Sequence, residues 1–257
     1  MVILRSLAIV FSIVLIWQIA CWAMAIPPYI LPSPMRVGVS FYNNFSLLSQ
    51  NSWVTFLEII LGLLAGGMFG FILAMILAYY HGLRHWLLPL IVISQAIPVF
   101  ALAPLFVLWF GYDILPKVLM AAIIIFFPIT TAFLDGLLKT NKNWVDAARV
   151  MNATKWKTLI YIRLPSALPN LASGLKIGTA VAPIGAVIGE WIGAGQGLGY
   201  IMIQANARGK VDLVFAVLII LSIGGTSLFF LSNYLSHKII EKFFPQENQS
   251  LLYSEAK

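Results

Sequence analysis

The sequence predicts an all-α protein that crosses a membrane several times. Of its 257 residues, 61% are hydrophobic and only 10% are Asp, Glu, Lys or Arg. Soluble domains carry about 25% charged residues. Six apolar runs are each long enough for a membrane-spanning helix, which needs about 20 residues. We therefore expect a polytopic integral membrane protein with about six transmembrane helices, forming a single domain over residues 1–257.

The apolar runs define the predicted spans. They cover residues 7–25, 53–80, 87–111, 116–138, 171–192 and 213–236. The first run follows Arg5 and ends at Ala23-Met24-Ala25, which imitates a signal-peptidase site. The hydrophobic part of a signal peptide is only about 7–15 residues long, and this run is longer. We expect residues 1–25 to be retained as a span.

Glycine recurs every fourth residue in two of the spans. Gly62, Gly66 and Gly70 have this spacing in the second span, and the fifth repeats it from Gly185 onward. Small residues at this spacing allow two helices to approach closely. The pattern therefore predicts tight helix packing.

Prolines and glycines disturb the helical pattern in two other places. The third span contains Pro89, Pro98 and Pro104, and such breaks are tolerated at membrane depth where protein or a water-filled cavity replaces the lost partners. This span is therefore expected to line a pathway. Residues 193–211 are rich in glycine and polar side chains, so we predict an outer loop there.

Basic residues are concentrated between Lys139 and Lys176, which holds seven of the 16 Lys and Arg residues. With six spans, the side that carries this segment and both termini holds twelve of the 16. The other side holds Arg36, Lys117, Arg208 and Lys210. Lys and Arg are enriched in cytoplasmic loops, so the segment and both termini are predicted to be cytoplasmic. The net charge of +7 is explained by this topology, and no nucleic-acid partner is expected. The centre of the segment, residues 143–165, is predicted to lie in water.

Local signals within this centre predict two short helices joined by a sharp bend. Asn143 is expected to cap the first helix, with Asp146 in its first turn. Asn152 suits the left-handed conformation that closes a helix. Thr154 is expected to cap the second helix, and Pro165 to end it.

The same stretch resembles the cytoplasmic EAA loop of ABC-transporter permease subunits. That loop reads E-A-A, three residues, G, nine residues, I, one residue, L-P, and every spacing matches here, with Asp for Glu and Asn for Gly. In the family the loop docks in a groove of the ATPase subunit. The resemblance implies as coupling residues Asp146, Ala147, Ala148, Asn152, Ile162, Leu164 and Pro165. The alternative is a basic inner loop whose alanine pair is coincidental.

Further motifs resemble the permease branch that imports nitrate, sulfonates, taurine and thiamine precursors. They are L-P-S-P from residue 31, A-P-L from 103, F-F-P from 126, G-E-W from 189 and L-G-Y-I-M from 198. The last of these, together with A-N-A-R from 205, is most similar to permeases for the thiamine pyrimidine precursor hydroxymethylpyrimidine. Sulfonate, taurine or nitrate remains the alternative substrate.

The resemblance implies a multi-pass transport subunit of the bacterial cytoplasmic (inner) membrane and no enzyme. It implies three partners: a cytoplasmic ATP-binding subunit, a periplasmic or lipid-anchored binding protein that delivers the substrate, and a second copy of the permease. No cofactor or metal is expected.

Glu190 is the most informative single residue for the pathway. A carboxylate within a span is costly and faces protein or water, so Glu190 is either a gate residue or a structural partner of the glycine-rich loop. A structural role is favoured for Glu58. The predicted pathway or gate residues are Glu190, Trp191, Pro98, Pro104, Trp109 and Tyr200. The aromatic ones equally suit the membrane interface, where Trp and Tyr are enriched.

Two other classes compete with an importer subunit. The sequence contains no G-x-x-x-x-G-K-[ST] motif, so ATP hydrolysis would need a separate subunit. A secondary transporter driven by an ion gradient is the stronger alternative, but such proteins show internal repeats and several buried ionisable groups. The EAA-like segment favours the ATP-driven importer, because an autonomous transporter has no need of it.

Overall fold

The computed structural model describes residues 2–243, and every regular element in that range is a helix. In chain order they are α1 (Val2–Ala23), α2 (Pro34–Asn43), α3 (Phe45–Tyr79), α4 (His81–Ser94), α5 (Val99–Phe110), α6 (Ile114–Leu138), α7 (Lys142–Val150), α8 (Lys155–Thr158), the π-helical turn η1 (Leu159–Arg163), α9 (Leu164–Ser166), α10 (Leu168–Gly193), α11 (Leu198–Ala207) and α12 (Val211–Phe243). The predicted all-α class is confirmed. Lys257, which the charge count includes, lies outside the described residues.

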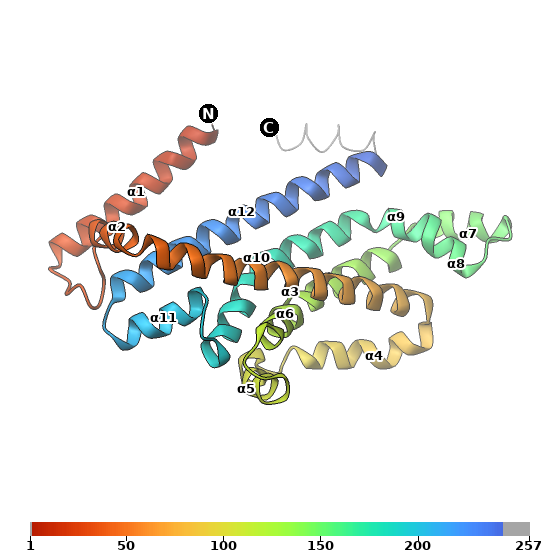
Figure 1. Ribbon diagram of the computed structural model, residues 1–257. Coiled ribbons are helices and arrows are strands. Elements are labelled where there is room, and N and C mark those ends of the chain that lie inside the picture. Colours follow the sequence, from red (N-terminus) through yellow and green to blue (C-terminus); the bar gives the residue numbers. More distant parts are fainter. Residues whose placement is uncertain (1, 244–257) are drawn as a thin grey trace.

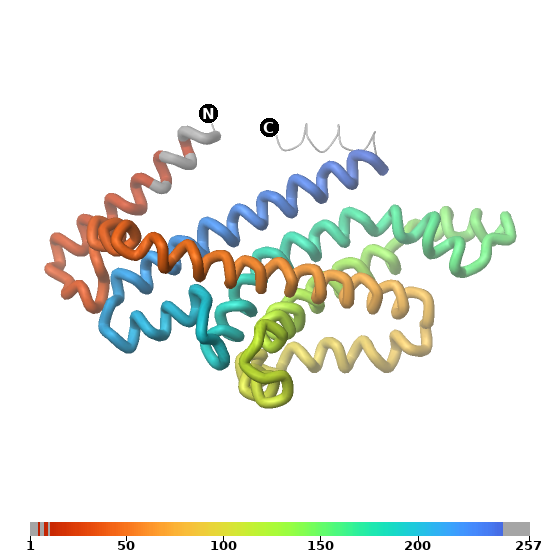
Figure 2. The backbone as a smooth tube through the Cα atoms, viewed as in Figure 1, coloured from red at the N-terminus to blue at the C-terminus, as the bar shows by residue number. Residues whose placement is uncertain are grey.

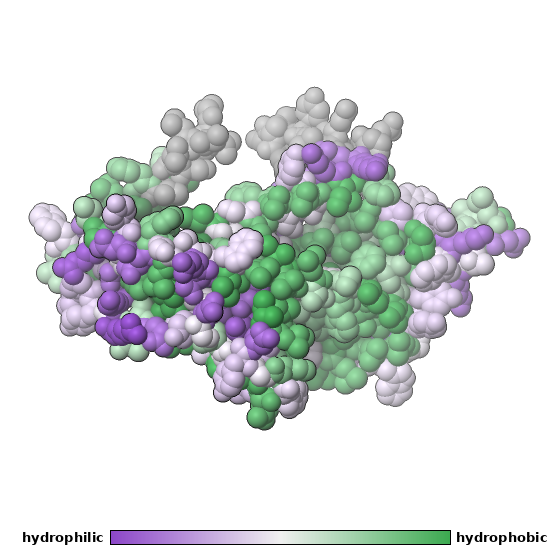
Figure 3. Space-filling view, viewed as in Figure 1, coloured by the Kyte–Doolittle hydropathy of each residue, from purple (hydrophilic) through white to green (hydrophobic). Residues whose placement is uncertain are grey.

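Four helices are long and apolar enough to cross a membrane. They are α3, α6, α10 and α12, and the bent pair of α4 and α5 would make a fifth span. In α1, the apolar stretch Phe11–Ala23 is shorter than a span, so six spans stay a prediction. On the face shown in Figure 3, hydrophobic residues cover most of the middle of the molecule. Hydrophilic residues gather toward α2 and α11 at one end, and toward the end of α12 and the hairpin of α7 and α8 at the other (Figures 1 and 3).

Glycines bring the central helices together, as their spacing predicted. A side chain on Gly62 of α3 would lie 2.4 Å from the Cβ of Ala121 in α6, and one on Gly185 of α10 would lie 2.5 Å from the Cα of the same alanine. Ala121 is fully buried. Helix α6 is therefore held between α3 and α10, at a distance that only glycine permits.

The predicted third span, 87–111, is not one continuous helix. The axes of α4 and α5 differ by 97°, and Pro98 is the extended residue before α5. Proline has no N–H to donate and clashes with the preceding turn, so the helix stops there. The chain doubles back after α3 and turns again between α4 and α5 (Figure 2).

The predicted loop at 193–211 is wrong in part, because it contains α11 (Leu198–Ala207). The chain leaves α10 after Gly193 and adopts a positive φ of 113° at Gly197. The segment that follows is mostly apolar and lacks proline, so it forms a helix once Gly197 has redirected the chain.

Pro165 does not end the second helix of the hairpin, contrary to the prediction. The chain continues through α8, the π turn, α9 and α10, with only Ala167, itself in helical conformation, between the last two. The π turn interrupts the α-helical hydrogen bonds just before Pro165. Pro165 therefore lies in the first turn of a new segment, where its missing N–H does no harm. As a result, the hairpin connects to span α10 without a flexible linker.

Candidate functional site

The first candidate site is the hairpin formed by α7, α8 and the π turn. Asn141, not Asn143, caps α7: its side-chain oxygen accepts a hydrogen bond of 2.9 Å from the backbone N–H of Asn143. Asp146 consequently lies in the middle of α7, where its carboxylate pairs with Arg149 at 2.9 Å. Both members of this pair are exposed, so the ion pair contributes little to stability.

The bend between the two helices follows the prediction. Asn152 has a φ of 56°, and the N–H groups of Asn152 and Ala153 donate to the carbonyls of Arg149 and Ala148, both at 2.9 Å. This is the hydrogen-bond pattern of a helix end closed by a left-handed residue. Thr154 caps α8 by accepting from the N–H of Lys157 at 3.2 Å.

The bend creates an apolar groove of about 670 Å³ between α7 and the π turn. Five of the seven predicted coupling residues line it: Ala147, Ala148, Asn152, Ile162 and Pro165. The groove also contains residues that the sequence analysis missed, namely Trp144, Met151 and Tyr161. Met151 is 82% exposed and Tyr161 76%. Exposed apolar surface of this kind is typical of protein–protein or membrane interaction sites.

The two remaining coupling residues lie elsewhere. Asp146 makes the ion pair described above, and Leu164 packs against the buried cluster at this end of the helices. That cluster contains Leu77, Phe133 and Leu159. Leu164 therefore fixes the hairpin to the spans and does not line the groove.

The second candidate site is a buried polar cluster around Glu190, at the opposite end of α10. Glu190 is 1% exposed. One of its carboxylate oxygens accepts a hydrogen bond of 2.6 Å from the Thr55 hydroxyl, and the other accepts from the N–H of Gly199. Glu190 thus bonds to the glycine-rich segment and to α3 at once.

Side chains of α3 complete the contacts at the start of α11. Asn51 accepts from the N–H of Gly197 at 2.7 Å, and the Thr55 hydroxyl oxygen accepts from the N–H of Leu198 at 2.8 Å. The first N–H groups of a helix have no partner within it, and here neighbouring helices supply the acceptors. The signal was present in the sequence as a polar stripe at Asn51, Thr55 and Glu58, spaced four and three residues apart on one helix face.

Glu58 belongs to the same region and pairs with Lys117 of α6. The Lys117 Nζ lies 3.3 Å from the Glu58 Oε1, and both side chains are buried. Neither carboxylate oxygen of Glu58 has a hydrogen-bond partner among the described residues. Lys117, which the charge count assigned to the outer side, is therefore buried between helices and does not face water. The buried pair also supports the structural role favoured for Glu58.

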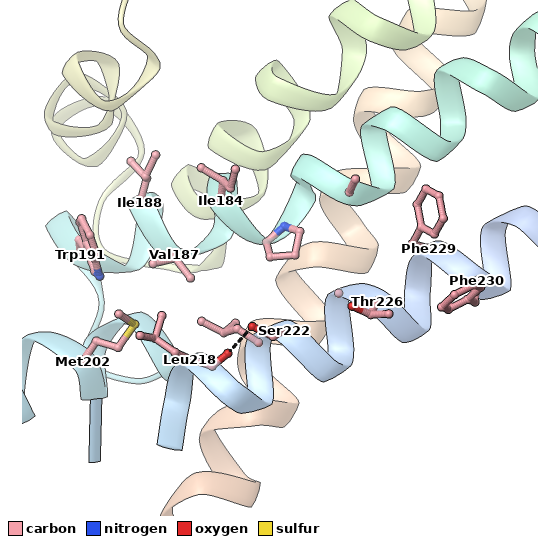
Figure 4. Close-up of a pocket in the computed structure, with 14 residues that line it drawn as sticks. Ile184, Val187, Ile188, Trp191, Met202, Leu218, Ser222, Thr226, Phe229 and Phe230 are labelled. Atoms are coloured by element: carbon pink, nitrogen blue, oxygen red, sulfur yellow. Dashed lines mark hydrogen bonds between the residues drawn. The ribbon is translucent and has the colours of Figure 1, made fainter. Parts of the chain in front are cut away.

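A groove of about 880 Å³ runs between α10 and α12 (Figure 4). Trp191 faces Met202 of α11 at one end, and Phe229 and Phe230 lie toward the other. Its polar groups include the hydroxyl of Ser222, which donates to the carbonyl of Leu218 at 2.8 Å. The residues that line the groove carry no charge.

The other predicted pathway residues do not join Trp191 in this groove. Pro98, just before α5, and Pro104, within α5, are both exposed. Trp109, which is 63% exposed, packs against Phe106 with ring centroids 6.0 Å apart. Tyr200 is half-buried in α11.

Comparison with known proteins places the chain in a family. Residues 66–241 match the model of the binding-protein-dependent transport system inner membrane component. A probable ABC transporter permease protein of Haemophilus influenzae is 49% identical over 92% of this chain and 97% of its own length. The formylaminopyrimidine transport permease protein ThiX of Halalkalibacterium halodurans is 38% identical over 83% of this chain and 85% of its own.

The fold agrees with this assignment. A chain from the MetNI methionine ABC transporter in inward-facing conformations superimposes with a TM-score of 0.62, covering 78% of this chain and 98% of that one, at 23% identity. Permeases of this family are not themselves enzymes, and ATP is hydrolysed by a separate subunit. With the family match over most of its length, the chain belongs to the binding-protein-dependent inner membrane components and is a permease subunit of an ABC importer.

Proposed function

We propose that this permease imports a thiamine pyrimidine precursor of the hydroxymethylpyrimidine type. Two identical copies form the pathway, a binding protein delivers the substrate from outside, and a cytoplasmic ATPase drives the cycle. The similarity to a formylaminopyrimidine permease over most of both chains supports the substrate class. The concentration of basic residues near the hairpin supports a cytoplasmic position for it and for both termini.

The observation that carries the coupling mechanism is the exposed apolar groove of the hairpin. Trp144, Met151 and Tyr161 present large apolar surfaces beyond the ends of the spans, where only a soluble partner can cover them. We assign this groove to the ATPase subunit. Because α8 continues through the π turn into α10, a displacement of the docked hairpin would move α10 as well.

We assign the translocation pathway to the face that carries the groove between α10 and α12. Trp191 lies in that groove, and its neighbour Glu190 holds α11 in place from within the protein. Glu190 is therefore a positioning residue that fixes the end of α10. A groove with aromatic side chains and no charged residue suits a flat, uncharged heterocycle better than a sulfonate, whose charge would lose its hydration there.

Uptake of radiolabelled hydroxymethylpyrimidine tests this function. Cells would express the chain with its binding protein and either an active or a catalytically inactive ATPase. We expect uptake only with the active ATPase, and a decrease for Trp191→Ala but not for Trp22→Ala, an exposed tryptophan of α1 outside the groove. ATPase-dependent uptake of taurine alone would refute the substrate. The coupling mechanism would be refuted if uptake were the same with active and inactive ATPase and were lost when the proton gradient is dissipated.

A further inference from the structure

A second cavity, of about 470 Å³, lies between the turn that joins α3 to α4 and the inner side of the hairpin. Four cationic side chains line it: Arg84, Arg149, Lys155 and Arg163. No acidic side chain is among its lining residues. The cavity is thus strongly positive, and it shares only Ala153 and Thr158 with the apolar groove assigned to the ATPase.

The positive charges of the cavity are not balanced within it. Asp146 reaches only Arg149, from the exposed side of α7. Burial, together with the charges of Arg149 and Arg84, lowers the pKa of the half-buried Arg163 guanidinium. Three guanidinium groups therefore repel one another here, and a bound anion would relieve that repulsion.

The position of the cavity narrows the choice of anion. Its walls include Tyr79 at the end of α3, His81 at the start of α4 and Leu138 at the end of α6. Tyr80, between α3 and α4, is 57% exposed, and Trp86, within α4, is 77% exposed. Such side chains prefer the level of the lipid headgroups. The cavity therefore opens where the hydrocarbon layer ends.

We propose that this cavity binds the phosphate of an anionic phospholipid headgroup. Guanidinium groups match phosphate oxygens in paired hydrogen bonds, and basic pockets between membrane helices on the cytoplasmic side bind such headgroups. Helix α4 offers a surface for the acyl chains, because Leu83, Trp86 and Leu90 lie exposed along one face. A lipid held there would contact both the hairpin and the spans.

Nanodiscs of defined composition test the proposal with the full-length permease. The thermal midpoint of unfolding would be measured in discs of phosphatidylcholine alone and in discs that also contain phosphatidylglycerol. Native mass spectrometry would count the phosphatidylglycerol molecules that the protein retains. We expect phosphatidylglycerol to raise the midpoint of the unmodified protein. In the double variant Arg84→Gln/Arg163→Gln the rise should vanish, with retention falling roughly fivefold for each charge removed.

The matched control is Lys139→Gln/Lys142→Gln, which removes two exposed charges near the hairpin but outside the cavity. An equal loss of phosphatidylglycerol retention in this control would refute a specific site.

Inorganic phosphate tests whether the ligand is a lipid. If it gives the full rise in thermal midpoint in phosphatidylcholine discs, a lipid is refuted as the source. If the ATPase subunit displaces phosphatidylglycerol and the cavity variant fails to bind the ATPase, these two results together refute the lipid and reassign the cavity to a protein partner. If the cavity variant is less stable in phosphatidylcholine alone, retention of phosphatidylglycerol is compared at a temperature below its midpoint. Retention equal to that of the unmodified protein would then refute the lipid site.

Discussion

The buried pair of Lys117 and Glu58 permits a quantitative prediction. At 3.3 Å, two unit charges attract by about 5 kcal/mol at an effective dielectric constant of about 20, against about 1 kcal/mol in water. Desolvation offsets much of that attraction, so the net contribution of the intact pair is small. Removing one member is different, because it leaves a buried charge without a counterion, at a cost of about 3–5 kcal/mol.

Lys117→Met is therefore expected to destabilise the protein by about 3–5 kcal/mol. Such a loss lowers the thermal midpoint by roughly 10 °C in a chain of this size. The double variant Lys117→Met/Glu58→Leu should regain most of the stability, since neither charge remains buried. Differential scanning fluorimetry in detergent, combined as a double-mutant cycle, measures the coupling between the two residues.

Lys139→Met supplies the matched control. Lys139 pairs with Asp135 at 3.0 Å, a shorter distance than in the buried pair, but both side chains are more than half exposed. Water screens such a pair, so the loss should stay below about 1 kcal/mol. If Lys117→Met costs no more than Lys139→Met, burial does not strengthen the pair and the reasoning is refuted.

Three further predictions concern the hairpin and the helix packing. Ala148→Glu places a charge in the apolar groove and should abolish copurification of the ATPase, while Asn143→Glu, an exposed position outside that groove, should not. Asn152→Val should weaken docking and uptake and lower stability by about 1–2 kcal/mol, because a β-branched residue resists the φ of 56°. Gly66→Ala should cost about 1–3 kcal/mol, because its Cβ would lie 2.6 Å from the Ala122 carbonyl oxygen. Gly67→Ala should be nearly neutral, since its Cβ meets an atom only at 3.7 Å. If Gly66→Ala and Gly67→Ala have the same thermal midpoint, the packing argument is contradicted.

The features that the sequence predicted best depend on short-range chemistry. Asn152 adopts the left-handed conformation and Thr154 caps the following helix, because both outcomes are decided by the few residues around them. The glycine spacing in α3 and α10 also predicted close packing correctly. It could not identify α6 as the shared partner, since the spacing of one helix does not specify its neighbour.

The features that escaped prediction depend on contacts distant in sequence. Lys117 was assigned to the outer side by the six-span topology, and its burial escaped prediction because its partner Glu58 lies on another helix. The glycines before α11 indicated a loop, and the acceptors that complete the start of that helix come from α3 and α10. Neither arrangement leaves a local signal apart from the polar stripe that runs from Asn51 to Glu58.

Helix α10 joins the two candidate sites physically. Its first residues follow the hairpin through a π turn, and its last turn carries Glu190, bonded to α3 and α11, beside Trp191 in the groove. The glycine contacts of α10 and α3 with α6 leave no room for these three helices to slide independently. A force on the hairpin should therefore move them as one body. The groove between α10 and α12, which we propose as part of the pathway, leaves room for the distance between this body and α12 to change.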